Sequence, residues 1–108
     1  MKLTTPEKVI QLQILKYLKL IGATAGKTKT MGTPLVTKRG RGFRFDPYTF
    51  IGFPDITGFH KKRIFFIEVK SEKGKLSPAQ KEFQKICEES GNLYIVARSV
   101  EDVMQFIY

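Results

Sequence analysis

Two carboxylates and one lysine stand where two neighbouring strands are expected to meet: Asp55, Glu68 and Lys70. The mostly apolar run at residues 63–70 ends in Glu68 and Lys70, and alternation along a strand places both side chains on one face. Asp55 begins the preceding run, at residues 55–59, which a short turn joins to the second run as a hairpin. Two carboxylates and one ammonium group can therefore meet in a small volume.

This set of groups favours phosphodiester hydrolysis assisted by a divalent metal ion. Two carboxylates in close contact repel each other, and one of them holds a proton unless a cation intervenes. Their oxygens suit Mg²⁺ or Mn²⁺, and few protein ligands are needed because Mg²⁺ keeps several of its waters. The cation can activate a water and hold a phosphate oxygen, while Lys70 positions that water or stabilises the charge that builds up on the phosphate.

The elements that must position these groups follow from periodicity and capping. Apolar residues recur at helical spacing within residues 4–21, where Thr4 and Glu7 have the spacing of a capping box. Ser77 and Gln80 have the same spacing at the start of a second helix. The expected order is a helix at 4–21, strands at 55–59 and 63–70, a helix at 77–90, a strand at 93–97 and a closing helix at 99–108. That order predicts an α/β sandwich whose sheet is covered by helices.

The composition predicts one small globular domain with a polyanionic partner. The 108 residues fit a single domain, 1–108, and 42% of them are hydrophobic. A formal net charge of +9 on so small a domain favours nucleic acid over an anionic membrane surface. The one cysteine, Cys87, allows no disulfide within the chain and argues against a thiolate zinc site.

The N-terminal segment does not have the pattern of a secretion signal. Polar and charged residues interrupt the stretch that would form its apolar part, at Gln11, Gln13, Lys16 and Lys19. No apolar run reaches the ~18–20 residues of a membrane span. We therefore expect a cytoplasmic protein that is neither secreted nor bound to a membrane.

Residues 22–54 form a long, basic and glycine-rich connection that we expect to be irregular, with a strand around residues 30–37 as one interpretation. So long a connection inside a small domain is usually functional or mobile. Four of its cations are expected to contact DNA phosphates: Lys38, Arg39, Arg41 and Arg44. The alternative is that they form only a solvated surface.

Three segments stand out in order along the chain: Gly52-Phe53-Pro54-Asp55, Phe66-Ile67-Glu68-Val69-Lys70-Ser71 and Gly74-Lys75-Leu76-Ser77-Pro78-Ala79-Gln80. Together they resemble the VRR-NUC family, the virus-type replication and repair nucleases of the PD-(D/E)XK superfamily. A bare Pro-Asp followed by Glu-x-Lys is a weak pattern, and the third segment with the right order of elements makes it specific. The resemblance covers nearly the whole chain and implies a PD-(D/E)XK nuclease-like core, with a central mixed sheet flanked by helices.

The resemblance also implies roles for individual residues of the hairpin. Asp55 and Glu68 would be metal ligands, with the main-chain carbonyl of Val69 as a third ligand. Lys70 would be the catalytic lysine. The implied cofactor is Mg²⁺ or Mn²⁺, in agreement with the oxygen ligands.

Three further residues have more than one interpretation. Glu7 and Gln80 match helix positions of the family that face the catalytic site, and the resemblance assigns them catalytic roles. Each could instead be only a helix-capping residue, and that alternative stays open. His60 belongs to a basic turn, and we expect it to be solvent-exposed and not a ligand.

The resemblance suggests a DNA endonuclease that selects branched DNA such as four-way (Holliday) junctions. Symmetric cleavage of a junction needs two active sites, so a homodimer is expected. Family members this small look like virus-encoded stand-alone nucleases, for which the location would be the host-cell cytoplasm. Two rivals remain: a nuclease of the same fold that acts on flaps, nicks or duplex DNA, and a non-catalytic DNA-binding module. The clustered acids argue against the second rival, because they would repel phosphate.

Overall fold

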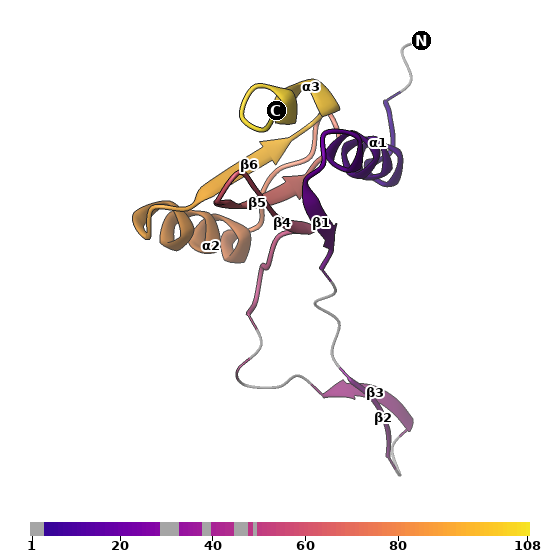
Figure 1. Ribbon diagram of the computed structural model, residues 1–108. Coiled ribbons are helices and arrows are strands. Elements are labelled where there is room, and N and C mark those ends of the chain that lie inside the picture. Colours follow the sequence, from indigo (N-terminus) through magenta and orange to yellow (C-terminus); the bar gives the residue numbers. More distant parts are fainter. Residues whose placement is uncertain (1–3, 29–32, 38–39, 45–47, 49) are drawn as a thin grey trace.

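The computed structural model of the protein describes residues 4–28, 33–37, 40–44, 48 and 50–108 (Figure 1). Its elements, in chain order, are α1 (Glu7–Leu20), β1 (Thr24–Lys27), β2 (Thr33–Thr37), β3 (Gly40–Arg44), β4 (Ile56–His60), β5 (Arg63–Val69), α2 (Pro78–Glu89), β6 (Leu93–Ala97) and α3 (Val100–Met104). Four strands form the main sheet in the order β1-β4-β5-β6, and β2 pairs with β3 in a separate two-stranded sheet.

The main sheet is mixed, as expected. β1 and β5 both run antiparallel to β4, whereas β6 runs parallel to β5. A parallel neighbour requires a crossover connection, and α2 supplies it between β5 and β6. The α/β sandwich with a central mixed sheet and flanking helices is therefore confirmed.

One face of the sheet carries the hydrophobic core beneath α1 and α3, and α2 lies on the other face (Figure 1). Ile10, Ile14 and Leu18 form the buried stripe of α1. They pack in one cluster with side chains of β5 such as Phe65 and Ile67. Burial of each such side chain contributes about 1.5–3 kcal/mol, and this face of the sheet is thereby held rigid.

Both helix starts were expected to be capping boxes, and only one is. At α2 the Ser77 hydroxyl accepts from the Gln80 main-chain N–H, and the Gln80 side chain accepts from the Ser77 main-chain N–H. At α1 the N-cap position is taken by Pro6, with no side-chain cap hydrogen bond. The prediction of a capping box between Thr4 and Glu7 is therefore wrong. The residue before a proline avoids the helical region, and the helix begins only after Pro6.

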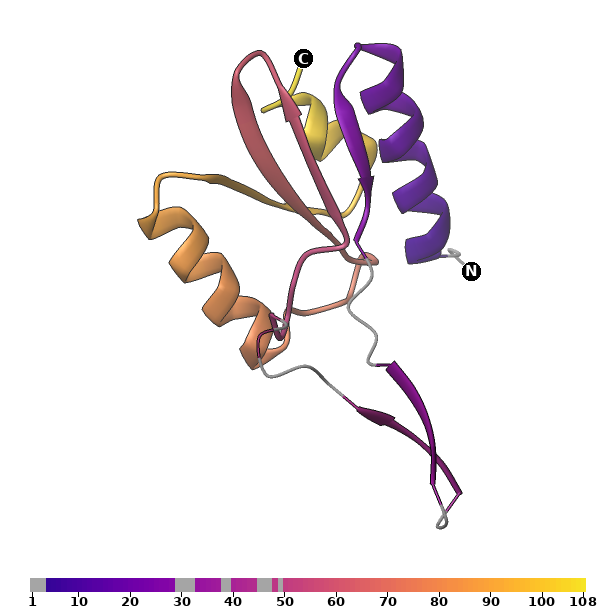
Figure 2. The ribbon, with the colours of Figure 1, turned by 60° about the horizontal axis from the view of Figure 1, so that its bottom comes forward.

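The segment 22–54 is more ordered than expected. β1 extends the main sheet as an edge strand, and β2 with β3 forms a hairpin that stands away from that sheet (Figure 2). The strand expected around residues 30–37 corresponds to β2, at Thr33–Thr37. β1 approaches β4 closely at Gly58, where an added Cβ would lie 2.6 Å from the Ala25 Cβ.

The turn between β4 and β5 also differs from its expected form. His60 is the last residue of β4, and Lys61 and Lys62 alone make the turn. His60 is half-buried, and its Nε2 atom is buried without a hydrogen-bond partner among the described residues. The prediction of an exposed His60 is therefore wrong, because pairing with Arg63 places it inside the ladder.

Among the described residues, no helix combines the length and the apolar character needed to cross a lipid bilayer.

Candidate active site

Asp55 and Glu68 meet at the end of the β4–β5 hairpin. Ile56 pairs with Ile67, so the next step of the antiparallel ladder brings Asp55 opposite Glu68. Main-chain N–H groups of Val69 and Thr28 hold Asp55 in place. Its Oδ2 atom accepts from the Val69 N–H at 2.9 Å, and its main-chain carbonyl accepts from the Thr28 N–H at 2.8 Å. The two carboxylates expected from the sequence therefore lie together.

Glu68 is the one buried charged side chain among the described residues, with 1% of its surface exposed. Burial raises the pKa of Glu68 from its ordinary 4.5 to about 9, helped by hydrogen bonding to Asp55 and by the Asp55 charge. A carboxyl group in this position holds a proton at neutral pH when no cation is present. Acids of this kind are typical of functional sites, where such a shift has a use.

Gln80 brings α2 into contact with the buried acid. Its side-chain Nε2 donates to Glu68 Oε1 at 3.0 Å. The Oε1 atom of the same amide accepts from the Ser77 N–H at 2.8 Å, as the capping box requires. The capping role and the site role of Gln80 are therefore not alternatives, because one amide group fills both.

The start of α2 lies against the loop that precedes Asp55. Gly52 has a φ of +75°, and a Cβ at this position would lie 2.6 Å from both the C and O atoms of Ala79. Only glycine combines that backbone conformation with so close an approach. Gly52 thereby sets the distance between the Asp55 loop and the helix that carries Gln80.

Lys70 and Glu7 act on the site through their charges. Lys70 is half-buried, and its charge lowers the pKa of Glu68. Glu7 is exposed at the first position of α1, and its charge raises the pKa of Glu68. Both effects are smaller than that of burial, and they place an ammonium group and a third carboxylate within electrostatic reach of the buried acid.

Two polar residues near the site were not expected from the sequence. The Tyr94 hydroxyl is buried without a hydrogen-bond partner in the described part of the chain, and burial followed by the charges of Glu68 and Asp55 raises its pKa. Arg98 Nη1 donates to the carbonyls of Ser71 at 2.6 Å and Gly74 at 2.7 Å, which fixes the loop after Lys70. Tyr94 has the sequence pattern of a core residue in an apolar strand, and no sequence motif marks Arg98.

An aromatic cluster forms the apolar wall on the α2 side of the sheet. Phe53, Phe66 and Phe83 are packed with ring centroids 5.0 to 5.9 Å apart. Phe50 and Tyr94 extend the cluster at its two sides, through contacts with Phe83. Because Phe66 lies two residues before Glu68 on the same strand face, the aromatic cluster lies next to the acid on that face of the sheet.

The four cations expected to contact phosphate belong to the basic segment between β1 and β4. Lys38 and Arg39 lie outside the described residues. Arg41 and Arg44 belong to β3, for which the structure describes the backbone course alone. Within the described ranges, no three His, Cys, Asp or Glu side chains come together as a metal-binding group. A cation at Asp55 and Glu68 would thus depend on two carboxylates and main-chain or water oxygens.

The fold and the site together define a class of protein. A mixed four-stranded sheet with flanking helices, opening at one end into paired carboxylates and a lysine, is compatible with the α/β core of PD-(D/E)XK nucleases. The family model described as the VRR-NUC domain matches residues 48–101. The chain belongs to the VRR-NUC domain family, which implies a nuclease-type function in DNA processing.

Comparison with solved structures agrees with this assignment at the level of the fold. A solved chain described as a VRR-NUC domain is similar with a TM-score of 0.70 and 20% sequence identity. The similarity covers 94% of this chain and 97% of that chain. No curated protein sequence matches this chain.

Proposed function

We propose that the protein is a metal-dependent DNA endonuclease whose active site is formed by Asp55, Glu68 and Lys70. The observation that carries this proposal is the buried Glu68, which lies opposite Asp55 and receives a hydrogen bond from Gln80. An acid at this position does not stabilise the fold, because burial of a carboxylate costs free energy of folding. A cation-binding function explains why the acid is present.

The residues fit a divalent cation such as Mg²⁺ or Mn²⁺. The raised pKa of Glu68 results from burial beside another acid, and a cation would relieve both effects. The donors are oxygens: the carboxylates of Asp55 and Glu68, with the Val69 carbonyl as a third ligand. The bound ion would supply positive charge that stabilises the phosphate and activates a water.

The chain's own residues would orient the ligands and the substrate. The Val69 N–H holds Asp55 Oδ2, and Gln80 holds Glu68 Oε1, so each carboxylate keeps a second oxygen for a cation. The ammonium group of Lys70 would position the attacking water or stabilise charge on the phosphate. Glu7 lies within electrostatic reach of Glu68, and it would add negative charge that favours cation binding.

The substrate is proposed to be branched DNA, with four-way junctions first, and the assembly a homodimer with two active sites. The net charge of +9 supports an extended DNA contact. Light scattering at micromolar concentration tests the dimer, alone and with junction DNA. A monomer in both conditions would contradict the dimer and leave the nuclease proposal intact.

Cleavage assays separate this proposal from its rivals. The protein would be incubated with labelled junction, flap and duplex DNA of equal length, with and without Mn²⁺. We expect cleavage only with the metal, and fastest on the junction. Faster cleavage of a flap or duplex would change the substrate, whereas binding without any cleavage would favour the DNA-binding module.

A further inference from the structure

The turn between β4 and β5 places two lysines in an unfavourable backbone conformation. Lys61 and Lys62 have φ values of 50° and 65°, and they are the only non-glycine residues with positive φ among the described residues. A two-residue hairpin turn of this type strongly favours Asn-Gly, because side chains with a Cβ are disfavoured in the left-handed region. The chain thus carries two cations where the turn alone would favour other residues.

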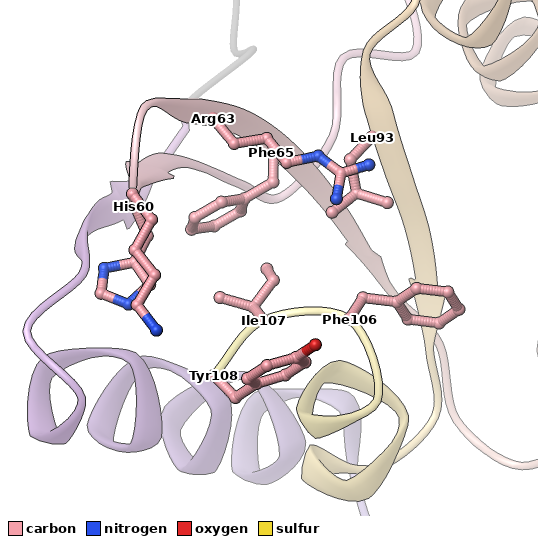
Figure 3. A pocket seen from close by; sticks show the side chains of 8 residues that line it. His60, Arg63, Phe65, Leu93, Phe106, Ile107 and Tyr108 are labelled. Atoms are coloured by element: carbon pink, nitrogen blue, oxygen red, sulfur yellow. The ribbon is translucent and has the colours of Figure 1, made fainter.

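A cavity of about 190 Å³ lies beside this turn. Its polar lining residues are His60, Lys61 and Arg63, and its apolar ones include Phe106, Ile107 and Tyr108. The Arg63 guanidinium lies beside Leu93, across the cavity from His60 (Figure 3). Phe65 closes the cavity from the sheet (Figure 3). The volume is below the ~300 Å³ at which pockets for whole drug-sized ligands begin, so the cavity fits one unit of a larger ligand.

The aromatic surface of the cavity is accessible. Tyr108 is 72% exposed and Phe106 is 52% exposed. The Lys61 ammonium lies 5.8 Å from the centroid of the Tyr108 ring. A positive charge that can take a phosphate therefore lies over one face of the Tyr108 ring, and the exposed remainder of the ring can stack with a planar group.

We infer that this cavity is a binding site for an unpaired strand of DNA, separate from the cleavage site. Cationic side chains interleaved with exposed aromatic rings bind single strands, because the bases stack on the rings and the phosphates meet the cations. In duplex DNA the bases are stacked on one another, so a duplex could contact only the cationic side chains of this site. One nucleotide unit would place its base against Tyr108 and its phosphate at the turn, near Lys61.

Arg63 of this cavity and Glu68 of the paired carboxylates lie at opposite ends of β5. Arg63 and Glu68 are five residues apart on one strand, which corresponds to roughly 17 Å at ~3.3 Å per residue. Phe65 belongs to the core cluster shared with α1 and α3, whereas Gln80 approaches Glu68 from α2. The inferred site thus lies at the other end of the hairpin, and it does not require the proposed nuclease activity.

The first test compares two variants that each remove two positive charges. Lys61→Asn with Lys62→Gly gives the turn its preferred residues, and Lys81→Gln with Lys85→Gln removes an exposed pair from α2. Binding of a ten-residue oligothymidylate would be measured in EDTA, which prevents cleavage. We expect about tenfold weaker binding and a higher melting temperature for the turn variant, and less than a twofold change in binding for the α2 variant. Equal losses of affinity would overturn the inference.

The second test isolates the aromatic contact. The oligothymidylate would be compared with an abasic strand of the same length, which has the same phosphates and no bases. We expect the wild-type protein to bind the strand with bases at least fivefold more tightly, and Tyr108→Ala with Phe106→Ala to lose this preference. Equal affinity of the wild-type protein for both strands would overturn the site. Because cleavage is not measured, failure here would leave the nuclease proposal intact.

Discussion

The side-chain amide of Gln80 joins the start of α2 to the buried Glu68 through a hydrogen bond of 3.0 Å from Nε2 to Oε1. Its other atom, Oε1, accepts from the Ser77 N–H at 2.8 Å. One residue therefore connects the stability of the helix to the orientation of the acid. Substitutions can separate the two effects, since each atom of the amide has its own partner.

Gln80→Glu should keep the cap and lose the contact to an ionised Glu68. A glutamate still accepts from the Ser77 N–H, and its charge suits a helix N-terminus. It has no donor for the Glu68 carboxylate and adds a like charge at this contact, so turnover at saturating Mn²⁺ should fall about tenfold or more although the cap to Ser77 is kept.

Ser77→Ala is the matched control for the capping role. It removes the hydroxyl that accepts from the Gln80 N–H and leaves the Gln80–Glu68 hydrogen bond in place. Stability should fall by roughly 0.5–2 kcal/mol, with little effect on turnover. If both variants lower stability and turnover in the same proportion, Gln80 acts only through the helix.

Glu68 should make the stability of the metal-free protein depend on pH. Its pKa is raised from 4.5 to about 9 in the folded state, so the folded protein binds more protons than the unfolded chain between these values. The contribution of Glu68 is therefore fully present below about pH 4.5 and is lost as the pH rises towards 9. Denaturation in EDTA should show a free energy of unfolding that falls across this range.

Glu68→Gln supplies the comparison, because the amide has the same size and does not titrate. The difference in stability between the wild type and this variant should shrink or reverse as the pH rises from 5 to 9, within the range set by the raised pKa. Mn²⁺ should stabilise the wild type most at the high end of that range. A difference that does not change with pH would mean that Glu68 titrates normally.

Gly52→Ala should disturb the packing of the loop before Asp55 against the start of α2. An added Cβ would lie 2.6 Å from the main chain of Ala79, in addition to the cost of about 1–2 kcal/mol for a side chain at positive φ. Gly91 has a φ of +81° and nothing within 4 Å of an added Cβ, so Gly91→Ala measures the conformational cost alone. We expect a larger loss of stability, and a loss of turnover, only for Gly52→Ala. Equal effects in thermal melts and cleavage assays would contradict the role given to Gly52.

The positive charges of the basic segment should contribute to the salt dependence of DNA binding. A variant with alanine at Lys38, Arg39, Arg41 and Arg44 removes four cations. If each contacts a phosphate of duplex DNA, the slope of log affinity against log salt should fall by about 3.6, at ~0.9 per contact. Titrations at several salt concentrations measure this slope, and an unchanged value would mean that these cations are only solvated.

Most of the elements around Asp55 and Glu68 could be predicted from local patterns. The apolar run of β5 and the Ser77–Gln80 spacing at α2 each follow from a short stretch of sequence. β1 could not be predicted, because Thr24–Lys27 has little apolar character and is held as a strand by its pairing with β4. Tertiary pairing, and not local propensity, determines this element.

The meeting of Asp55 and Glu68 was predictable from the sequence, whereas the contacts around them were less so. Asp55 and Glu68 were brought together by a strand hairpin whose alternation was visible in the sequence. The double role of Gln80 depends on the approach of α2 to Gly52, which no spacing along the chain encodes. The Tyr94 hydroxyl, which has no hydrogen-bond partner among the described residues, likewise depends on packing between α2 and the sheet.

The central claim is that Asp55 and Glu68 bind the metal, while Lys70 acts on the reaction. Asp55→Asn should keep the fold and bind Mn²⁺ poorly, because an amide is a weaker ligand than a carboxylate. Lys70→Ala should still bind Mn²⁺, and loss of one charge at the transition state should lower turnover about 10²–10³-fold. Both variants should retain DNA affinity, which depends mainly on the basic surface.

The most direct measurement combines calorimetry of Mn²⁺ binding with cleavage of one branched DNA by these variants and the wild type. The predicted result is loss of metal binding and cleavage for Asp55→Asn, and loss of cleavage alone for Lys70→Ala. Cleavage by both variants at the wild-type rate would contradict the account and remove the active site from these residues.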